Sequence, residues 1–242
     1  MKEKYLGMNK KVIILIAIVI LAISAYGAYY ISDTYHADET ALKYMNGTDD
    51  VAVIKTENGL LLDGPGNDTA LIFYPGAKIE YISYLPLLTQ ISTEGVDCFL
   101  VEMPLNLAIF GKNSADDIIN QYNYTEYVMS GHSLGGVMAA QYLNETNNTD
   151  ALILLAAYSD KQINKPVLSI YATEDKVLNM ETYNENLPFI SNNLSEVIID
   201  GGNHAQIGNY GNQPKDGIAK ISPQKQQKEI ADEIIRFIDG LN

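Results

Sequence analysis

The stretch YVMSGHSLGGVMAAQYL, Tyr127 to Leu143, decides the fold of this chain. It places Ser133 among closely spaced glycines, between an apolar run typical of a buried strand and a run with helical character. Residues Gly131 to Gly135 fit the pattern G-x-S-x-G, in which a strand ends, the chain reverses sharply and a helix begins. Glycines two positions before and after the serine let the strand and the helix approach each other closely.

The serine of such a turn sits in a strained backbone conformation that exposes its hydroxyl group. The N-terminus of the following helix directs amide groups and a positive dipole to the same point, where they stabilise a developing oxyanion. A glycine-rich turn with a capping serine is the structural alternative. A phosphate-binding loop fits less well, because no Gly-Lys-Ser/Thr sequence follows. The pattern therefore favours Ser133 as a nucleophile.

A serine hydroxyl is a weak nucleophile near neutral pH and needs a base and an orienting acid, which in this kind of sheet follow in the order Ser, Asp/Glu, His. The chain has three histidines. His36 lies in a polar segment near the N-terminus, and His132 is the neighbour of Ser133, where adjacent side chains diverge. His204 follows the last predicted strand, in IIDGGNHAQIGNYG, among glycines that suit a mobile loop. We expect His204 to be the base.

The acid is expected after the preceding strand, in PVLSIYATEDKVL. Asp175 is preferred over its neighbour Glu174, because the D-x-V spacing is typical of this turn. Asp160 follows the strand that precedes this one in the sequence, and it is an alternative acid. Asp200, close to His204 in the sequence, is interpreted as structural.

Two backbone N–H groups are needed to bind an oxyanion. One is expected from Leu134, directly after the serine, and the other from Ala77 in FYPGAKIE, where Gly76 gives the backbone clearance. Lys78 is a candidate for attracting an anionic substrate or is a solvated surface lysine. Glu102, in VEMPLN at a strand end, is a candidate for touching substrate or orienting the loop, with a structural hydrogen-bonding role as the alternative.

Strands alternate with helices from Val51 onward, which predicts an α/β fold with a mostly parallel sheet and helices on both faces. Pro86 is expected to interrupt or bend the helix 79–93, and Ser114 to cap the helix that follows it. Only Ser159 to Lys165 separate one strand from Pro166, which leaves no room for a lid domain and predicts an open pocket. The expected strands are 51–56, 59–66, 69–76, 97–104, 124–131, 150–158, 166–173 and 195–202; the other expected helices are 114–122, 134–146 and 223–241.

An uncharged run of 20 residues, Val12 to Ile31, precedes this region. As a helix it would span ~30 Å, about the thickness of a bilayer's hydrocarbon core. Lysines precede the run, which predicts a cytoplasmic N-terminus and an exported remainder. A cleaved signal peptide with a site near Ala25-Tyr26-Gly27 is the alternative, but the run is longer than a typical signal core. Six Asn-x-Ser/Thr triplets agree weakly with export: Asn46, Asn67, Asn123, Asn144, Asn147 and Asn193.

The formal net charge is −14, from 16 basic and 30 acidic residues, which disfavours nucleic-acid binding. The single cysteine, Cys98, cannot form an internal disulfide bond and lies in a strand-like apolar run. The sequence therefore predicts a folded acidic domain with no nucleic-acid partner, and it does not indicate an oligomeric state.

Taken together, FYPGAKIE, VEMPLNLAIF, GHSLGG, YATEDKVL and GGNHAQIGNYG resemble the α/β-hydrolase superfamily over Val51 to Asn242. More narrowly they resemble a membrane-anchored branch of small bacterial and archaeal hydrolases related to dienelactone hydrolases. The dienelactone enzymes use a cysteine nucleophile where this chain has Ser133, so their substrate is not expected here. The resemblance implies a lid-free α/β-hydrolase fold and a triad of Ser133, Asp175 and His204, with no metal or cofactor.

The expected organisation is a cytoplasmic N-terminus (1–11), a transmembrane anchor or signal peptide (12–31), a spacer (32–50) and an α/β-hydrolase domain (51–242). The expected activity is cleavage of carboxylic esters or related acyl groups through an acyl-enzyme on Ser133, with a small or flexible acyl group or the exposed end of a larger substrate. It is expected at the outer side of the cell membrane, or in a secreted protein if the N-terminal segment is cleaved. An acyltransferase with the same triad and a catalytically inactive surface binding domain are the alternatives.

Overall fold

The computed structural model describes residues 10–66, 68–190 and 194–241, and it divides the chain into two compact units, Met1–Thr34 and Tyr35–Asn242. Most of the predicted cytoplasmic N-terminus, residues 1–9, lies outside the described residues. The same holds for Asn67 and Asn193 of the predicted Asn-x-Ser/Thr sites.

The first unit contains one helix, α1 (Lys10–Ser32), whose apolar side chains are largely exposed. Its stretch Lys10–Gly27 has a mean hydropathy of 2.1. Among the described residues it is the one helix long and apolar enough to cross a membrane, a property that an N-terminal signal sequence shares. Length and composition thus agree with the predicted anchor and leave the signal-peptide alternative open.

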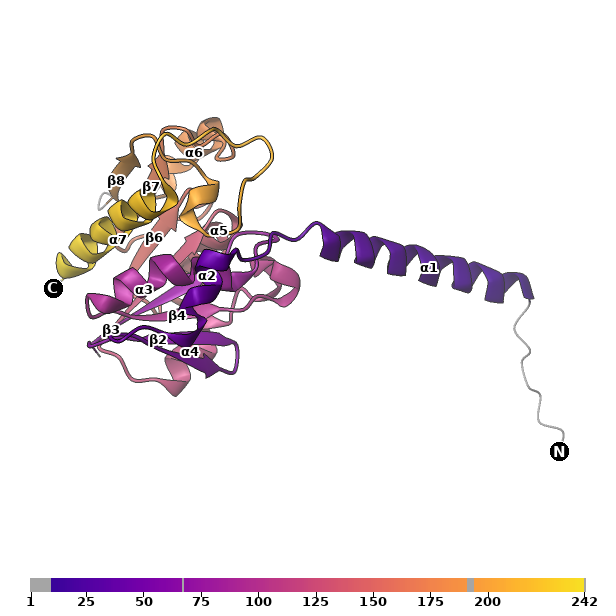
Figure 1. The fold of residues 1–242 in the computed structure, drawn as a ribbon, viewed down its shortest axis with the longest axis horizontal. Coiled ribbons are helices and arrows are strands. Elements are labelled where there is room, and N and C mark those ends of the chain that lie inside the picture. The colour runs from indigo at the N-terminus through magenta and orange to yellow at the C-terminus, as the bar shows by residue number, and fades with distance from the viewer. Residues whose placement is uncertain (1–9, 67, 191–193, 242) are drawn as a thin grey trace. The chain divides into compact units, whose positions relative to one another are not determined.

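The second unit contains a central sheet flanked by helices (Figure 1). The sheet has eight strands in the order β1-β2-β4-β3-β5-β6-β7-β8. β2 pairs antiparallel with β1 and β4, and every other neighbouring pair is parallel. The strands are β1 (Ala52–Thr56), β2 (Gly59–Asp63), β3 (Thr69–Tyr74), β4 (Asp97–Val101), β5 (Glu126–His132), β6 (Ala151–Leu155), β7 (Val167–Ala172) and β8 (Leu194–Ile199). The mostly parallel sheet predicted from the sequence is confirmed.

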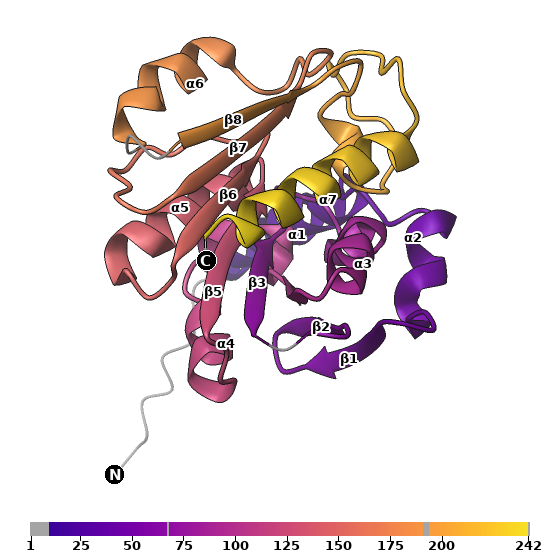
Figure 2. The same cartoon turned by 90° about the vertical axis from the view of Figure 1, so that its left-hand side faces the viewer.

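Helices cover both faces of this sheet. The helices α3 (Leu85–Thr93) and α7 (Pro223–Asp239) lie side by side on one face, while α4 (Ala115–Gln121) and α5 (Leu134–Thr146) pack on the other (Figure 2). Successive side chains of a strand point to opposite faces, so each buried strand contributes to two cores. In β3, for example, Phe73 packs with α3 and α7, and Tyr74 packs with α4 and α5.

Part of the segment predicted as a spacer contacts the sheet-containing body. The amide of Tyr35 donates to the carbonyl oxygen of Lys78 (2.7 Å), and the amide of Glu80 donates back to Tyr35 (2.9 Å). The short helix α2 (Glu39–Lys43) follows, and its Ala41 is fully buried. Residues 35–46 thereby close off one end of the core that contains α3.

Three local details differ from the sequence-based expectations. Pro86 occupies the first turn of α3, directly after a 3₁₀ turn, η2 (Tyr81–Tyr84), so it starts the helix instead of interrupting it. Ser114 precedes α4 but makes no capping hydrogen bond through its side chain. The helix α6 (Met180–Asn186) was not predicted, because its sequence METYNEN has only one buried residue, Tyr183, and no apolar period.

Candidate active site

Ser133 occupies the sharp turn between β5 and α5, with φ 53° and ψ −124°. A positive φ is unusual for serine, and such strained conformations cluster at functional sites. The backbone amide of Ser133 donates to the carbonyl oxygen of Leu155 in β6 (2.9 Å), which fixes the turn to the neighbouring strand. The strand–turn–helix context that the G-x-S-x-G pattern requires is therefore present.

The surrounding glycines are needed because backbone and side chains crowd this turn. A Cβ atom on Gly131 would lie 2.5 Å from the carbonyl carbon of Gly135. A Cβ atom on Gly135 would overlap the carbonyl oxygens of Tyr74 and Pro75. Both pairs are main-chain contacts, so no side-chain rearrangement could relieve the overlap.

His204 and Asp175 form a buried pair at the carboxyl edge of the sheet. Nδ1 of His204 lies 2.8 Å from Oδ2 of Asp175, and both side chains are about 2% exposed. The other carboxylate oxygen, Oδ1, accepts from the amides of Val177 and Leu178, each at 2.8 Å. The carboxylate is thus fully occupied and can hold the imidazole in one orientation.

The rival acids are engaged elsewhere. Glu174 pairs with Lys220 (Oε1 to Nζ 2.5 Å), and this cation lowers the pKa of the carboxyl. Asp160 accepts from the amide of Gln141, and Asp200 accepts weakly from Thr173 (3.4 Å). Of the four acids considered from the sequence, the structure brings Asp175 to His204.

Ser133 and His204 line the same pocket, whose volume is about 270 Å³. No hydrogen bond joins the Ser133 hydroxyl to His204 in the part of the chain that the structure describes. Catalytic hydrogen bonds of this kind are commonly long in ligand-free proteins. The other lining residues are mostly apolar: Leu134, Val137, Ala156, Ala157, Tyr158, Val177, Leu178 and Asn179.

The connection between β6 and β7, residues 156–166, contains no helix. Its first residues, Ala156, Ala157 and Tyr158, line the pocket. The segment is as short as the sequence indicates, and the open pocket expected from it stays a prediction.

The loop after β3 begins where the carbonyl oxygens of Tyr74 and Pro75 approach Gly135 of the serine turn. The amide of Gly76 donates to the phenol oxygen of Tyr84 (3.1 Å), and that of Lys78 donates to the carbonyl oxygen of Asn106 (2.8 Å). The amides of Ala77 and Leu134 donate to no acceptor among the described residues. These two remain available for an oxyanion.

The two remaining candidates differ in their placement. Lys78 directly follows Ala77 in the loop after β3 and has a positive φ of 59°. Glu102 is exposed at the end of β4, where its amide donates to the carbonyl oxygen of Asn58 (2.9 Å). Neither side chain lines the pocket of Ser133 and His204.

A buried histidine behind His204 was not assigned a role from the sequence. Nδ1 of His132 lies 2.7 Å from the phenol oxygen of Tyr84, which also accepts from Gly76. The rings of His132 and His204 are 4.4 Å apart between centroids. Burial, and then the neighbouring His204, lower the pKa of His132 well below its usual value, so this imidazole is neutral. His132 and Tyr84 thus connect the His204 ring to the loop that carries Ala77.

The segment that carries His204 is held in place rather than loose, contrary to the mobile loop expected from its glycines. Gln226 of α7 bonds both the amide (3.0 Å) and the carbonyl oxygen (2.7 Å) of Asn203. Asp216 accepts from the amide of Ala205 (2.9 Å). No local sequence signal indicates these contacts, because Gln226 lies 23 residues from Asn203.

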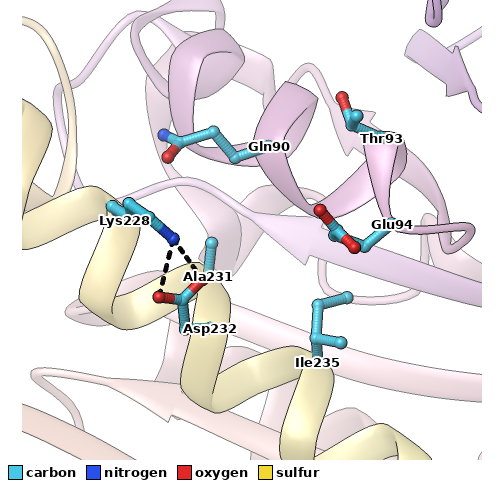
Figure 3. A pocket seen from close by; sticks show the side chains of 7 residues that line it. All are labelled: Gln90, Thr93, Glu94, Lys228, Ala231, Asp232 and Ile235. Carbon is cyan, nitrogen blue, oxygen red and sulfur yellow. Dashed lines mark hydrogen bonds and ion pairs between the residues drawn. The ribbon is translucent and has the colours of Figure 1, made fainter.

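A second pocket of about 330 Å³ lies between α3 and α7, away from these groups (Figure 3). An ion pair between Lys228 and Asp232 (2.8 Å) lies at its rim. Its remaining lining residues are Gln90, Thr93, Glu94, Ala231 and Ile235. Within the described ranges, no group of three or more His, Cys, Asp or Glu side chains is arranged to hold a metal ion.

Several solved structures share this fold. A predicted CIB-like hydrolase from Thermoplasma acidophilum is 14% identical with a TM-score of 0.56, covering 76% of this chain and 96% of its own. Est1E from Butyrivibrio proteoclasticus is 14% identical with a TM-score of 0.54, and the match covers 79% of this chain and 100% of Est1E. A membrane phospholipase A described as a bacterial virulence factor is 13% identical with a TM-score of 0.58, and the match covers 96% of this chain and 99% of the phospholipase. At such identities the likeness shows the fold alone.

No curated protein matches this sequence. The family model described as the alpha/beta hydrolase family matches residues 70–228, which include the serine turn, Asp175 and His204. That match covers well over half of the chain, and the strand order, the parallel sheet and the serine turn agree with it. The chain therefore belongs to the alpha/beta hydrolase family.

Proposed function

We propose that this protein is a membrane-anchored serine hydrolase that cleaves carboxylic esters or related acyl groups. The observation that carries the proposal is the buried Asp175–His204 pair, which shares one pocket with Ser133 at its strained turn. Acyl transfer through a covalent intermediate requires a nucleophilic hydroxyl, an imidazole base and a carboxylate that orients the imidazole.

In the proposed reaction, Oγ of Ser133 attacks the acyl carbon while Nε2 of His204 takes its proton. The imidazolium that forms is stabilised by Asp175, which accepts from Nδ1. The amides of Ala77 and Leu134 stabilise the tetrahedral oxyanion. His204 then gives the proton to the leaving alcohol, and a water molecule activated by the same imidazole releases the acid and restores Ser133.

The pocket supports a small or flexible acyl group. Its walls are mostly apolar, and its volume is about 270 Å³, at the lower end of the size of small-molecule sites. The helix-free connection 156–166 leaves room for a larger leaving group to extend outside the pocket.

The experiment is hydrolysis of nitrophenyl esters of increasing acyl length by the full chain and by Ser133→Ala. Removing one triad member costs about 10⁴–10⁶-fold in turnover where the triad acts as a unit. Ser130→Ala is the matched control: Ser130 lies in β5, the strand that ends just before Ser133, its hydroxyl is buried without a partner, and it is outside the pocket. Full activity in Ser133→Ala would contradict the proposal.

The proposed location is the outer side of the cell membrane, with α1 as the anchor. It rests on the apolar stretch Lys10–Gly27 and on the lysines before the uncharged run. Protease added to intact cells should digest the second unit, and the same unit should stay in the membrane pellet before digestion. Digestion only after permeabilisation would contradict the proposed orientation, and release of the unit into the medium would indicate a cleaved signal peptide.

A further inference from the structure

The loop after β4 exposes an unusual set of apolar side chains. Leu105 is 66% exposed, Ile109 is 49% exposed and Phe110 is 59% exposed. The nine residues 103–111 carry no charge, although the chain as a whole has a net charge of −14. Exposed apolar residues that gather in one uncharged segment indicate an interaction surface more strongly than the same residues scattered over the surface.

The backbone of this loop is strained and yet firmly held. Leu105 has φ 56° and Asn106 has φ 52°, a region that non-glycine residues seldom adopt. Met103 and Ala108 are buried beneath the loop, and the carbonyl oxygen of Asn106 accepts from the amide of Lys78 (2.8 Å). The protein thus holds a leucine in an unfavourable conformation that leaves its side chain in solvent, a combination that is typical of functional loops.

The loop is bonded to the segment where the second unit begins. Lys78, which bonds Asn106, also accepts from the amide of Tyr35 (2.7 Å). In the sequence only Asp33 and Thr34 separate Tyr35 from Ser32, the last residue of α1. Three residue steps of extended chain span at most about 11 Å. If α1 is anchored, chain length alone keeps Tyr35 within about 11 Å of the end of that helix, so the loop bonded beside Tyr35 can reach the membrane surface.

We propose that Leu105, Ile109 and Phe110 insert into the interfacial layer of the membrane that holds α1. This inference rests on the proposed membrane anchor. The uncharged apolar segment suits this role, because burying apolar side chains at the boundary of headgroups and acyl chains is favourable and no charge has to be desolvated. The loop leaves the carboxyl end of β4, the edge of the parallel sheet from which Ser133 also emerges, so insertion holds the edge that carries the candidate site at the lipid surface.

The test uses the full chain reconstituted in phospholipid vesicles, with one environment-sensitive fluorophore (nitrobenzoxadiazole) on an introduced cysteine. The native Cys98 is fully buried and is therefore not expected to react. Phe110→Cys is compared with Phe189→Cys. Both phenylalanines are exposed and both end a 3₁₀ helix, η4 (Ala108–Phe110) and η5 (Leu187–Phe189). Phe189 precedes β8, which places it toward the opposite edge of the sheet.

The expected result is a blue-shifted emission for the label at 110 and severalfold quenching when the vesicles contain headgroup-proximal spin-labelled lipid. The label at 189 is expected to behave as in water, and a label on Leu105→Cys to follow the one at 110. A label at 110 that stays aqueous would overturn the inference. So would a blue shift without lipid quenching, because that pattern indicates a protein partner.

The same samples separate this inference from the proposed hydrolase activity. A chain that floats with the vesicles and reacts with a fluorophosphonate at Ser133, but leaves the label at 110 in water, contradicts the inference alone. Lipid quenching at 110 without any adduct on Ser133 supports the inference and contradicts the hydrolase. A chain that fails to float with vesicles contradicts both the anchor and the inserted loop.

Discussion

The imidazole ring of His132 lies against that of His204, with 4.4 Å between the ring centroids and 47° between the ring planes. Asp175 is hydrogen-bonded to Nδ1 of His204 (2.8 Å), and Tyr84 is hydrogen-bonded to Nδ1 of His132 (2.7 Å). Two buried protonated imidazoles at this distance would repel each other. His132 is kept neutral, because burial lowers its pKa, and it can therefore act as a fixed support for the candidate base.

The depressed pKa of His132 predicts a pH dependence of stability. Above about pH 6.5, histidine is mostly neutral in both the folded and the unfolded chain. Below that pH, residue 132 binds a proton in the unfolded chain, whereas buried His132 stays neutral in the folded chain. The free energy of unfolding therefore falls as the pH falls. One proton contributes at most about 1.4 kcal/mol per pH unit. We expect urea unfolding in detergent micelles to show this slope between pH 6.5 and pH 5.

His132→Asn is the comparison variant, because an Asn side chain can still accept from Tyr84 but does not titrate in this range. The slope of the variant should be shallower than that of the native chain by up to the contribution of one proton. Equal slopes in the two proteins would show that His132 is not the group responsible.

Tyr84→Phe should lower both stability and turnover. The change leaves two buried groups, the Gly76 amide and Nδ1 of His132, without their partner, which costs about 1–3 kcal/mol for each unsatisfied group. Because Gly76 directly precedes the oxyanion candidate Ala77, we expect kcat to fall more than KM rises. Steady-state kinetics and urea unfolding measure the two effects.

Tyr183→Phe is the matched control for this change. Tyr183 is equally buried, and its phenol is also hydrogen-bonded twice, to Ser169 (2.8 Å) and Glu196 (2.7 Å), but it lies outside the pocket. It should lose stability and keep its kcat. A similar fall of kcat in both variants would mean that Tyr84 acts only through general stability.

Asp175→Asn should reduce kcat by about 10⁴-fold, because an amide no longer favours the required tautomer of His204 or stabilises its charged form. Glu174→Gln should change kcat little, since that carboxylate pairs with Lys220 at the surface. Hydrolysis of a nitrophenyl ester compares the two. A greater loss in the Glu174 variant would reassign the acid.

Gly135→Ala should destabilise the fold, because its Cβ atom would overlap the carbonyl oxygens of Tyr74 and Pro75 in the main chain. Overpacking of this kind costs about 1–3 kcal/mol, and occasionally more. Gly240→Ala is the control, since its added Cβ would meet nothing closer than 3.4 Å. Thermal melts should show a clear drop for the first and little change for the second; equal melting temperatures would contradict the close approach described for the turn.

The elements that could be predicted from the sequence are those set by local rules. The G-x-S-x-G spacing lies within five residues and predicts the turn, and the alternation of strands and helices follows from apolar periodicity. The carbonyl oxygens of Tyr74 and Pro75 that crowd Gly135 come from a distant segment. The superfamily prediction is confirmed, whereas the dienelactone-related branch and the catalytic roles stay predictions. The Asp175–His204 contact was reached from chain order, because both residues follow strands whose carboxyl ends meet at one edge.

The remaining features depend on contacts between distant segments or on weak local patterns. Tyr84 meets His132 across 48 residues, and Gln226 meets Asn203 across 23, with no pattern in either segment to indicate the pairing. Ser114 has the residue type of a cap but not its hydrogen bond. The sequence predicts a spacer for residues 35–46, because their few apolar side chains are too sparse to show a periodic face, whereas in the structure several of them pack against the core.

The identity of the nucleophile is tested most directly by intact-protein and peptide mass spectrometry after brief exposure of the full chain to a fluorophosphonate. We expect a single adduct on the peptide that contains Ser133, formed at least 100-fold more slowly in His204→Ala and absent from Ser133→Ala. A native chain that stays unmodified, or an adduct that persists in Ser133→Ala, would contradict it.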